Sequence, residues 1–193
     1  MGSILLVRHG EASGDDSADP GLSSTGRLQA LALAGRLADQ EIGAVWHGPK
    51  RRAQETACLL ASHLRIDTWS TDLLDDRTPV PSARFRNEYT RRRLDWFDAV
   101  PEDERDEDGL ALAAAWSQLR SRDRPRRVVM VTHSFVISQF VALAVEARPS
   151  SWLRLTVSNA GLTILHEDAA GDLMLRLFND TTHIPLPSHG QVG

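Results

Sequence analysis

The sequence predicts an α/β fold, in the form of a three-layer α/β/α sandwich with a mainly parallel central sheet. Two short apolar runs, Ile4–Val7 and Val128–Thr132, have the Ile- and Val-rich composition of strands that are buried on both faces. Each run leads into a histidine, and helix-forming sequence follows further along the chain. Strands that alternate with helices indicate a parallel sheet covered on both sides, so we expect this architecture.

The size and composition of the chain suit one domain with a substantial core. Its 193 residues are 41% hydrophobic and 25% charged, and no linker or internal repeat divides them. We therefore expect a single domain over residues 1–193. A loose tail is expected from about residue 186, because the end of the chain is rich in Pro and Gly.

The charge and cysteine content argue against several partners and locations. A net charge of −4 gives no electrostatic reason to bind nucleic acid or a membrane surface. No run approaches the roughly 18–20 apolar residues of a membrane span, and the start lacks the pattern of a signal peptide. Cys58 is the only cysteine, which suits a reducing compartment, so we expect a cytoplasmic protein. The tryptophans suit a homodimer interface as well as a core.

The first third of the chain alternates between strand and helix signals. After the first strand and a polar loop, Leu22–Gly26 supplies Ser and Thr as helix N-caps, and Arg27–Gln40 is rich in helix formers. The short apolar stretch Ile42–Trp46 predicts a second buried strand. Pro49 then suits the first turn of a helix. Apolar residues recur on one face of that helix, at Ala53, Ala57, Leu60 and Leu64.

The middle of the chain is more polar and has weaker signals. Ile66–Ser70 is expected to form a third strand, and Thr71–Ser82, which contains several Asp and Pro residues, an irregular loop. Ala83–Trp96 predicts a basic helix. Acidic residues dominate Pro101–Gly109, so we expect a solvated loop that leads into a helix over Leu110–Arg120.

The last third returns to strong strand and helix signals. The apolar stretch Phe135–Ala147 predicts a helix directly after the second strong strand. Further strands are expected at Trp152–Val157, Leu162–Leu165 and Leu173–Phe178. The last two pair plausibly across the turn at Asp168–Asp172, which makes a hairpin.

Chemically versatile side chains follow the strands. His9 and His133 each come directly after a buried strand, and Arg8 and Arg52 lie near strand ends. The carboxyl ends of parallel strands meet at one rim, where open α/β sheets bind ligands. A neutral imidazole can attack phosphorus, and arginines neutralise the phosphate oxygens. These residues therefore predict a phosphate site that needs no metal, and the sequence contains no zinc, Walker or Gly-x-Ser-x-Gly motif.

Four motifs resemble those of the histidine phosphatase superfamily, which has the phosphoglycerate mutase-like fold. Arg8–Glu11 matches its Arg-His-Gly-Glu signature, and Leu22–Gly26 is similar to its Leu-Thr-x-x-Gly helix start. Gly48–Ala57 is similar to its Ser-Pro-x-x-Arg-Ala-x-x-Thr-Ala motif, although His47 and Gly48 stand where the family has a serine. Val131–His133 resembles its second-histidine motif. Together these motifs, in the family's order, cover almost the whole chain.

The resemblance implies a role for each matching residue. His9 would be the nucleophile that becomes phosphohistidine, and Arg8, Arg52 and His133 would complete the phosphate pocket. Arg52 is preferred to Arg51 because it lies three residues after the proline of the motif. The residues expected to add substrate contacts are Gly10, Glu11, Ser134, His47 and His183.

The sequence leaves more than one choice of proton donor, because the family's usual glutamate is absent. The stretch Leu73–Pro79 resembles the pattern of the mitochondrial protein-serine/threonine phosphatase branch, and on that alignment Asp76 is the acid. Asp75 is the second choice, and Glu88 or no acid at all remains open. If Asp76 is the donor, Asp76→Ala should impair alkyl phosphates more than aryl phosphates, because alkoxide leaving groups need the proton most.

The resemblance therefore implies a metal-independent, cofactor-free phosphomonoester hydrolase of the histidine acid phosphatase-like type. Its substrate would be a phosphorylated small molecule or a phosphoprotein. Two alternatives stay open: phosphoglycerate mutase-type phosphoryl transfer, and a phosphate-ester-binding or regulatory module with little turnover. The arginines within Arg84–Arg93 are expected to form either a solvated helix face or a contact for an acidic substrate, because the family usually builds a lid from this region.

Overall fold

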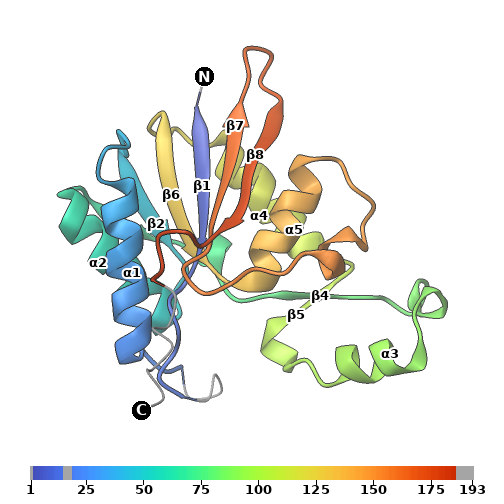
Figure 1. The fold of residues 1–193 in the computed structure, drawn as a ribbon. Helices are drawn as coiled ribbons and strands as arrows, with labels where there is room; N and C mark the ends of the chain where they lie inside the picture. The colour runs from blue at the N-terminus through green and yellow to red at the C-terminus, as the bar shows by residue number, and fades with distance from the viewer. Residues whose placement is uncertain (1, 15–18, 186–193) are drawn as a thin grey trace.

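The computed structural model describes residues 2–14 and 19–185, so the tail expected from about residue 186 lies outside the described residues. The described part folds around a six-stranded sheet with the order β3-β2-β6-β1-β7-β8 (Figure 1). The first four strands in this order are parallel, and β7 and β8 continue the sheet antiparallel. Their bounds are β1 Ser3–Arg8, β2 Ala44–His47, β3 Thr68–Ser70, β6 Arg127–Thr132, β7 Leu162–Glu167 and β8 Leu173–Asp180.

Helices cover both faces of this sheet, which confirms the predicted three-layer fold class (Figure 1). In β1, Leu5 and Val7 pack in the core with α1 and α2, whereas Ile4 and Leu6 pack in the core with α4 and α5. Because neighbouring strand residues point to opposite faces, one apolar run serves both cores. The helix bounds are α1 Ser24–Leu37, α2 Arg51–Leu64, α4 Leu110–Ser121 and α5 Ser134–Ala144.

The register of the two central strands places the two histidines side by side. Arg8 at the end of β1 lies opposite Thr132 at the end of β6. The residues that directly follow the two strands are His9 and His133, and the His9 N–H donates to the Thr132 carbonyl at 3.0 Å. Parallel pairing therefore brings residues that are more than 120 positions apart in the sequence to the same point of the rim.

One predicted strand is wrong, because its apolar residues are buried by a helix and not by a neighbouring strand. The stretch Trp152–Val157 begins in a 3₁₀ helix, η5, which spans Ser151–Arg154. The Trp152 side chain is buried in an aromatic cluster with Phe97 and Phe135. Periodicity cannot distinguish these two ways of burying a short apolar run.

The segment between β3 and α4 is more ordered than predicted. Part of the expected loop forms β4, Thr78–Val80, which pairs in parallel with β5, Arg105–Glu107, in a separate two-stranded sheet. The expected basic helix is wrong in its first half, where only the 3₁₀ turn η3, Arg86–Glu88, forms before α3, Arg91–Asp98. The Tyr89 ring meets the Phe97 ring edge-on at 5.1 Å, which folds the segment back on itself.

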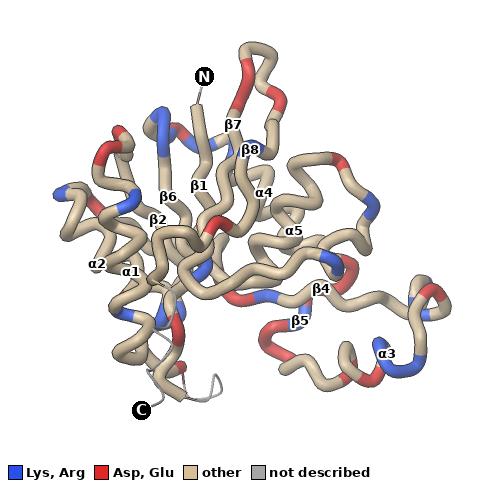
Figure 2. The backbone as a smooth tube through the Cα atoms, in the orientation of Figure 1, with Lys and Arg blue, Asp and Glu red and all other residues tan. Residues whose placement is uncertain are grey.

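The acidic stretch before α4 is also not a solvated loop throughout. It contains the 3₁₀ helix η4, Glu102–Glu104, and then β5, and its acidic residues gather just before β5 in Figure 2. Asp106 is buried, and its carboxylate accepts from the N–H groups of Ala111 and Leu112. A carboxylate that caps the first turn of a helix satisfies donors that have no partner within the helix. Asp106 therefore has a structural task.

Candidate active site

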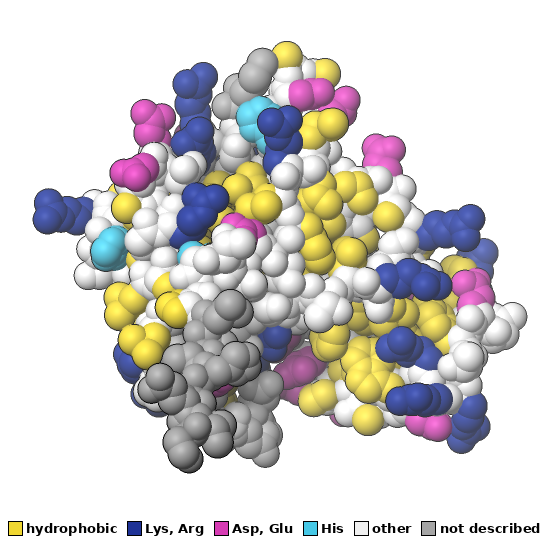
Figure 3. All heavy atoms as spheres, viewed as in Figure 1, with side chains coloured by type: hydrophobic (Ala, Val, Ile, Leu, Met, Phe, Trp, Pro, Cys, Tyr) yellow, Lys and Arg dark blue, Asp and Glu magenta, His cyan; other side chains and the backbone are white. Residues whose placement is uncertain are grey.

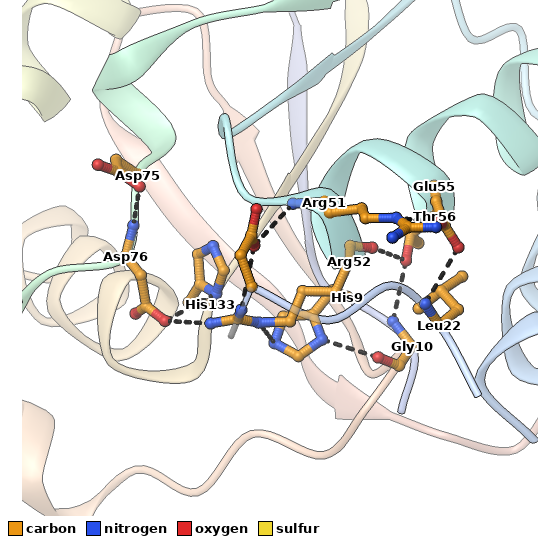
Figure 4. A network of polar contacts seen from close by, with 11 residues as sticks. His9, Gly10, Leu22, Arg51, Arg52, Glu55, Thr56, Asp75, Asp76 and His133 are labelled. Carbon is orange, nitrogen blue, oxygen red and sulfur yellow. Dashed lines mark hydrogen bonds and ion pairs between the residues drawn. The ribbon is translucent and has the colours of Figure 1, made fainter. Parts of the chain in front are cut away.

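A pocket of about 700 Å³ opens at the carboxyl ends of β1 and β6. All five residues predicted to be catalytic line it, and so does Ser134. Figure 4 shows four of the five, His9, Arg52, Asp76 and His133, close together. The remaining wall comes from the segment between β3 and α4 and from the starts of α2 and α5. The lining residues are Arg8, His9, Lys50, Arg52, Asp76, Thr78, Pro101, Asp103, Glu104, His133, Ser134 and Phe135.

His9 has a defined tautomer. Its Nδ1 lies 2.7 Å from the Gly10 carbonyl oxygen, which can only accept, so Nδ1 carries the proton. Its Nε2 accepts a hydrogen bond of 3.2 Å from Arg52 Nε, and this requires a free lone pair. Burial, then the neighbouring His133, then the charges of Arg52 and Arg8 lower the pKa of His9 to about 3. His9 is therefore a neutral imidazole whose lone pair faces a cationic environment.

Two arginines, Arg8 and Arg52, line the pocket together with Lys50 and add positive charge to it. Arg52 is almost completely buried at the start of α2, and its NH2 group forms an ion pair of 2.8 Å with Asp76 Oδ2. Arg8 NH1 donates to the Val157 carbonyl at 2.7 Å, which holds this side chain at the end of β1. Buried guanidinium groups can bind the oxygens of a phosphate in a fixed geometry.

His133 completes the pocket on the β6 side. Its ring centroid lies 5.0 Å from that of His9, and its Nδ1 lies 3.0 Å from Asp76 Oδ2. Its Nε2 is buried and has no hydrogen-bond partner within the described part of the chain. His133 directly precedes α5, so the positive end of that helix adds to the attraction for an anion. His133 therefore lies on the pocket wall with its Nδ1 held by Asp76.

The two candidate aspartates differ in their surroundings. Asp76 lines the pocket, whereas the Asp75 carboxylate accepts from the Asp76 N–H at 2.8 Å and does not line it. Burial opposes ionisation of Asp76, but the contact with His133 and the charge of Arg52 outweigh it and lower the pKa of Asp76 to about 2. Asp76 is therefore an ionised carboxylate at neutral pH, held between Arg52 and His133.

Asn159 and Thr56 support the site, and the sequence analysis did not single out either residue. Asn159 Nδ2 donates to the His9 carbonyl at 3.1 Å. The buried Thr56 Oγ1 accepts from the Gly10 N–H at 3.0 Å and donates to the Arg52 carbonyl at 2.8 Å, which ties the His9 turn to α2. Thr56 occupies the threonine position of the Gly48–Ala57 motif, so a signal was present. Nothing in the local pattern around Asn159 reveals its contact across the sheet.

We expect Thr56→Val to destabilise the fold by about 1–3 kcal/mol, because it leaves the buried Gly10 N–H without an acceptor. Urea unfolding measures this difference, with Thr56→Ser as the matched control because serine keeps the hydroxyl. Equal stability of Thr56→Val and Thr56→Ser would show that the two hydrogen bonds of the Thr56 hydroxyl contribute nothing to the free energy of unfolding.

Two further residues of the predicted set lie beside the pocket without lining it. At Gly10 the backbone passes close to α1, since a Cβ there would collide with the Gly26 carbonyl oxygen. The group that the Gly10 backbone approaches closely is thus the Gly26 backbone of α1. The Glu11 carboxylate accepts from Ser23 Oγ at 2.6 Å at the start of α1. Both residues shape the turn after His9.

The two remaining histidines of the predicted set also have partners within the protein. His47 is buried at the end of β2, and its Nδ1 lies 2.7 Å from the Gly48 carbonyl oxygen. His183 Nε2 lies 3.1 Å from the Ala160 carbonyl oxygen, so it reaches the loop behind His9. Neither residue lines the pocket in the described part of the chain.

The arginines of the Arg84–Arg93 segment do not line the pocket that contains His9 and His133. Arg86 forms a two-pronged ion pair with Asp98, and Arg91 pairs with Asp95 on the surface of α3. Figure 3 shows hydrophobic side chains gathered over this region, with Lys and Arg around them. The predicted contact with an acidic substrate therefore stays a prediction.

Comparison with known proteins agrees with the geometry. The family model of the histidine phosphatase superfamily (branch 1) matches residues 4–181. The curated serine/threonine-protein phosphatase PGAM5, mitochondrial, of Mus musculus is 28% identical over 192 residues, and its counterpart in Drosophila ananassae is 26% identical over 197 residues. These alignments cover 94% and 95% of this chain but 64% of each relative. The expected cytoplasmic location stays a prediction.

Solved structures show the same fold. Phosphoserine phosphatase of Entamoeba histolytica superposes with a TM-score of 0.73 at 19% identity, covering 96% of this chain and 100% of that one. A mycobacterial glucosyl-3-phosphoglycerate phosphatase gives 0.71 at 21% identity, covering 93% and 99%. No helix in the described residues is both long and apolar enough to span a bilayer. The matched family model and the pocket built from its motifs lead to one conclusion: the chain belongs to branch 1 of the histidine phosphatase superfamily.

Proposed function

We propose that this protein hydrolyses phosphomonoesters through a phosphohistidine formed on His9 Nε2. The observation that carries the proposal is the state of His9, which is neutral, has its Nδ1 proton fixed on Gly10, and directs its lone pair into the cationic pocket. The names of the curated relatives describe protein phosphatases, which supports the same reaction class. The substrate proposed is a phosphorylated small molecule or a phosphoprotein.

In the first step the phosphoryl group enters between the two arginines and His133. Arg52 Nε, which now donates to His9 Nε2, turns to a phosphate oxygen and frees the lone pair for attack. The N–P bond forms as the bond to the leaving oxygen breaks, and that oxygen takes up a proton. The guanidinium groups neutralise the charge on the equatorial oxygens, so this step needs no metal ion.

In the second step water attacks phosphorus from the side that the leaving group has vacated. The N–P bond breaks, the water loses a proton, and inorganic phosphate leaves His9 as the neutral imidazole. The net reaction consumes one ester and one water and produces one alcohol and one phosphate. A mutase would instead return the phosphoryl group to an organic acceptor.

The test is hydrolysis of p-nitrophenyl phosphate in excess EDTA, combined with acid-free quenching that traps a phosphoenzyme. We expect the enzyme to turn over the substrate in EDTA. When the phosphoryl group of the substrate is isotopically labelled, the label should appear on His9, where acid removes it and alkali does not. Phosphate binding without turnover or label would contradict the proposal and favour the binding module. Label that passes to an added alcohol faster than to water would favour the mutase.

The pH dependence of the free enzyme follows from the lowered pKa of His9. Protonation would remove the lone pair that attacks phosphorus, and with a pKa of about 3 the neutral form predominates at any higher pH. We therefore expect kcat/KM, corrected for ionisation of the substrate, not to fall through protonation of His9 near pH 6.5, which is the ordinary pKa of a histidine. NMR titration of the His9 ring measures this directly. A midpoint above 6.5 would contradict the electrostatic argument.

A further inference from the structure

Of the three carboxylates on the pocket wall, Asp103 is exposed, whereas Asp76 and Glu104 are partly buried and differ in their contacts. Asp76 is held by Arg52 at 2.8 Å and by His133 at 3.0 Å, both through the same oxygen. Glu104 lines the same pocket, is half-buried, and forms no hydrogen bond or ion pair through its side chain within the described residues. An acid that must present its proton to a leaving group needs a free carboxyl group, and Glu104 has one.

The small second sheet explains why Glu104 reaches the pocket. Parallel pairing of β4 with β5 places Thr78 opposite Arg105. Thr78 itself lines the pocket, Asp76 lies two residues before it, and Glu104 directly precedes Arg105. The two chain segments that carry Asp76 and Glu104 therefore enter the sheet side by side. This register brings Glu104 to the same pocket as Asp76 and Thr78.

The electrostatic surroundings favour the protonated form of Glu104. Burial raises its pKa, and the neighbouring charges of Asp76 and Asp103 raise it further. Lys50 and Arg52 act in the opposite direction, but the net shift is upward. Asp76 shows the reverse behaviour, with a pKa of about 2. The pocket thus shifts the pKa of Glu104 upward and that of Asp76 downward. Such opposite shifts are expected when one carboxyl group acts as an acid and the other stays ionised.

We propose that Glu104 is the proton donor to the leaving group and that Asp76 is a positioning residue for Arg52 and His133. The proposal rests on the proposed function. It replaces the sequence-based choice of Asp76, which rested on the resemblance of Leu73–Pro79 to the mitochondrial protein-serine/threonine phosphatase branch. Arg52 and His133 hold Asp76 as a carboxylate, which has no proton to donate, whereas Glu104 is not held by an ion pair and can approach the ester oxygen of a bound substrate.

Glu104 gives up one proton in the first step and regains one in the second. As His9 Nε2 bonds to phosphorus, the Glu104 carboxyl proton passes to the leaving oxygen, and the alcohol departs with Glu104 as carboxylate. That carboxylate then accepts a proton from the attacking water as the N–P bond breaks. Phosphate leaves, and Glu104 is again protonated for the next cycle.

The experiment compares leaving groups that differ in their need for a proton. Wild type, Glu104→Gln and Asp76→Asn are assayed with p-nitrophenyl phosphate and with glycerol 2-phosphate. We expect Glu104→Gln to lose about 10²-fold or more in kcat/KM on the alkyl ester and less than about 5-fold on the aryl ester. Asp76→Asn should lower both by a similar factor, because it disturbs the binding of phosphate. Glu102→Gln, on the exposed face of the same 3₁₀ helix, is the matched control for removal of one charge.

The pH profile gives a second readout that a structural role would not change. Wild-type kcat/KM on the alkyl ester should fall on the alkaline side as Glu104 ionises, and this limb should be missing in Glu104→Gln. Retained aryl turnover shows that the variant is folded. Equal losses of kcat/KM on both esters in Glu104→Gln would overturn the proposal, and so would a loss confined to the alkyl ester in Asp76→Asn. The proposed function would still stand in either case, because the wild type turns over both esters. A wild type with no turnover would refute both.

Discussion

Replacing His9 by alanine is expected to lower kcat for p-nitrophenyl phosphate by about 10⁴-fold or more, because the reaction loses the group that forms the covalent intermediate. The arginines and His133 remain, so the variant should still bind phosphate. Steady-state kinetics measures the loss, and calorimetric titration with inorganic phosphate measures the binding. The combination separates loss of the nucleophile from loss of the pocket.

The control for this prediction is His63→Ala, which removes an exposed imidazole from α2. This variant should keep the activity and the phosphate-stabilised melting temperature of the wild type. If His9→Ala retained more than about one hundredth of the wild-type kcat, another group would be the nucleophile, and the tautomer fixed by Gly10 would have no catalytic meaning.

Replacing Arg52 by methionine is expected to damage both stability and activity. Its loss leaves the mostly buried Asp76 carboxylate without its guanidinium partner, and removing one member of a buried ion pair costs about 3 kcal/mol or more. The same change removes a charge aimed at the phosphoryl group, so kcat/KM should fall by about 10³-fold. Urea unfolding and steady-state kinetics measure the two effects separately.

A second substitution distinguishes the two roles of Arg52. In Arg52→Met with Asp76→Asn, no unpaired charge is buried, so most of the stability should return while kcat/KM stays low. The matched control is Arg51→Met, because the Arg51 side chain is 64% exposed and its ion pair with Glu55 contributes at most about 1 kcal/mol. Recovery of activity in the double variant would show that Arg52 acts only through Asp76.

Local sequence was enough to predict the central part of this molecule. The apolar runs before His9 and His133 became the adjacent strands β1 and β6, and α2 begins at the residue before Arg52. The motif spacing also favoured Arg52 over Arg51, and only Arg52 is buried in the pocket. These features were predictable because each is expressed in neighbouring residues, as an unbroken apolar run or as a helix start at a fixed distance from a proline.

Other features depended on contacts between distant parts of the chain. The apolar stretch at Trp152 could form a strand or a helical turn, and only the aromatic cluster beneath it decided for the turn. Asp106 and Glu104 stand two residues apart in one acidic segment, yet the first caps a helix and the second lines the pocket. Charge composition cannot separate them.

The sequence by itself determined the family, the mainly parallel sheet and the two histidines and two arginines of the candidate active site. The tertiary structure decided which carboxylate is engaged and which is free, because that depends on the β4–β5 register and on the distances from Asp76 to Arg52 and His133. A pKa is set by burial and by charges within a few ångströms, and neither quantity is encoded in local periodicity.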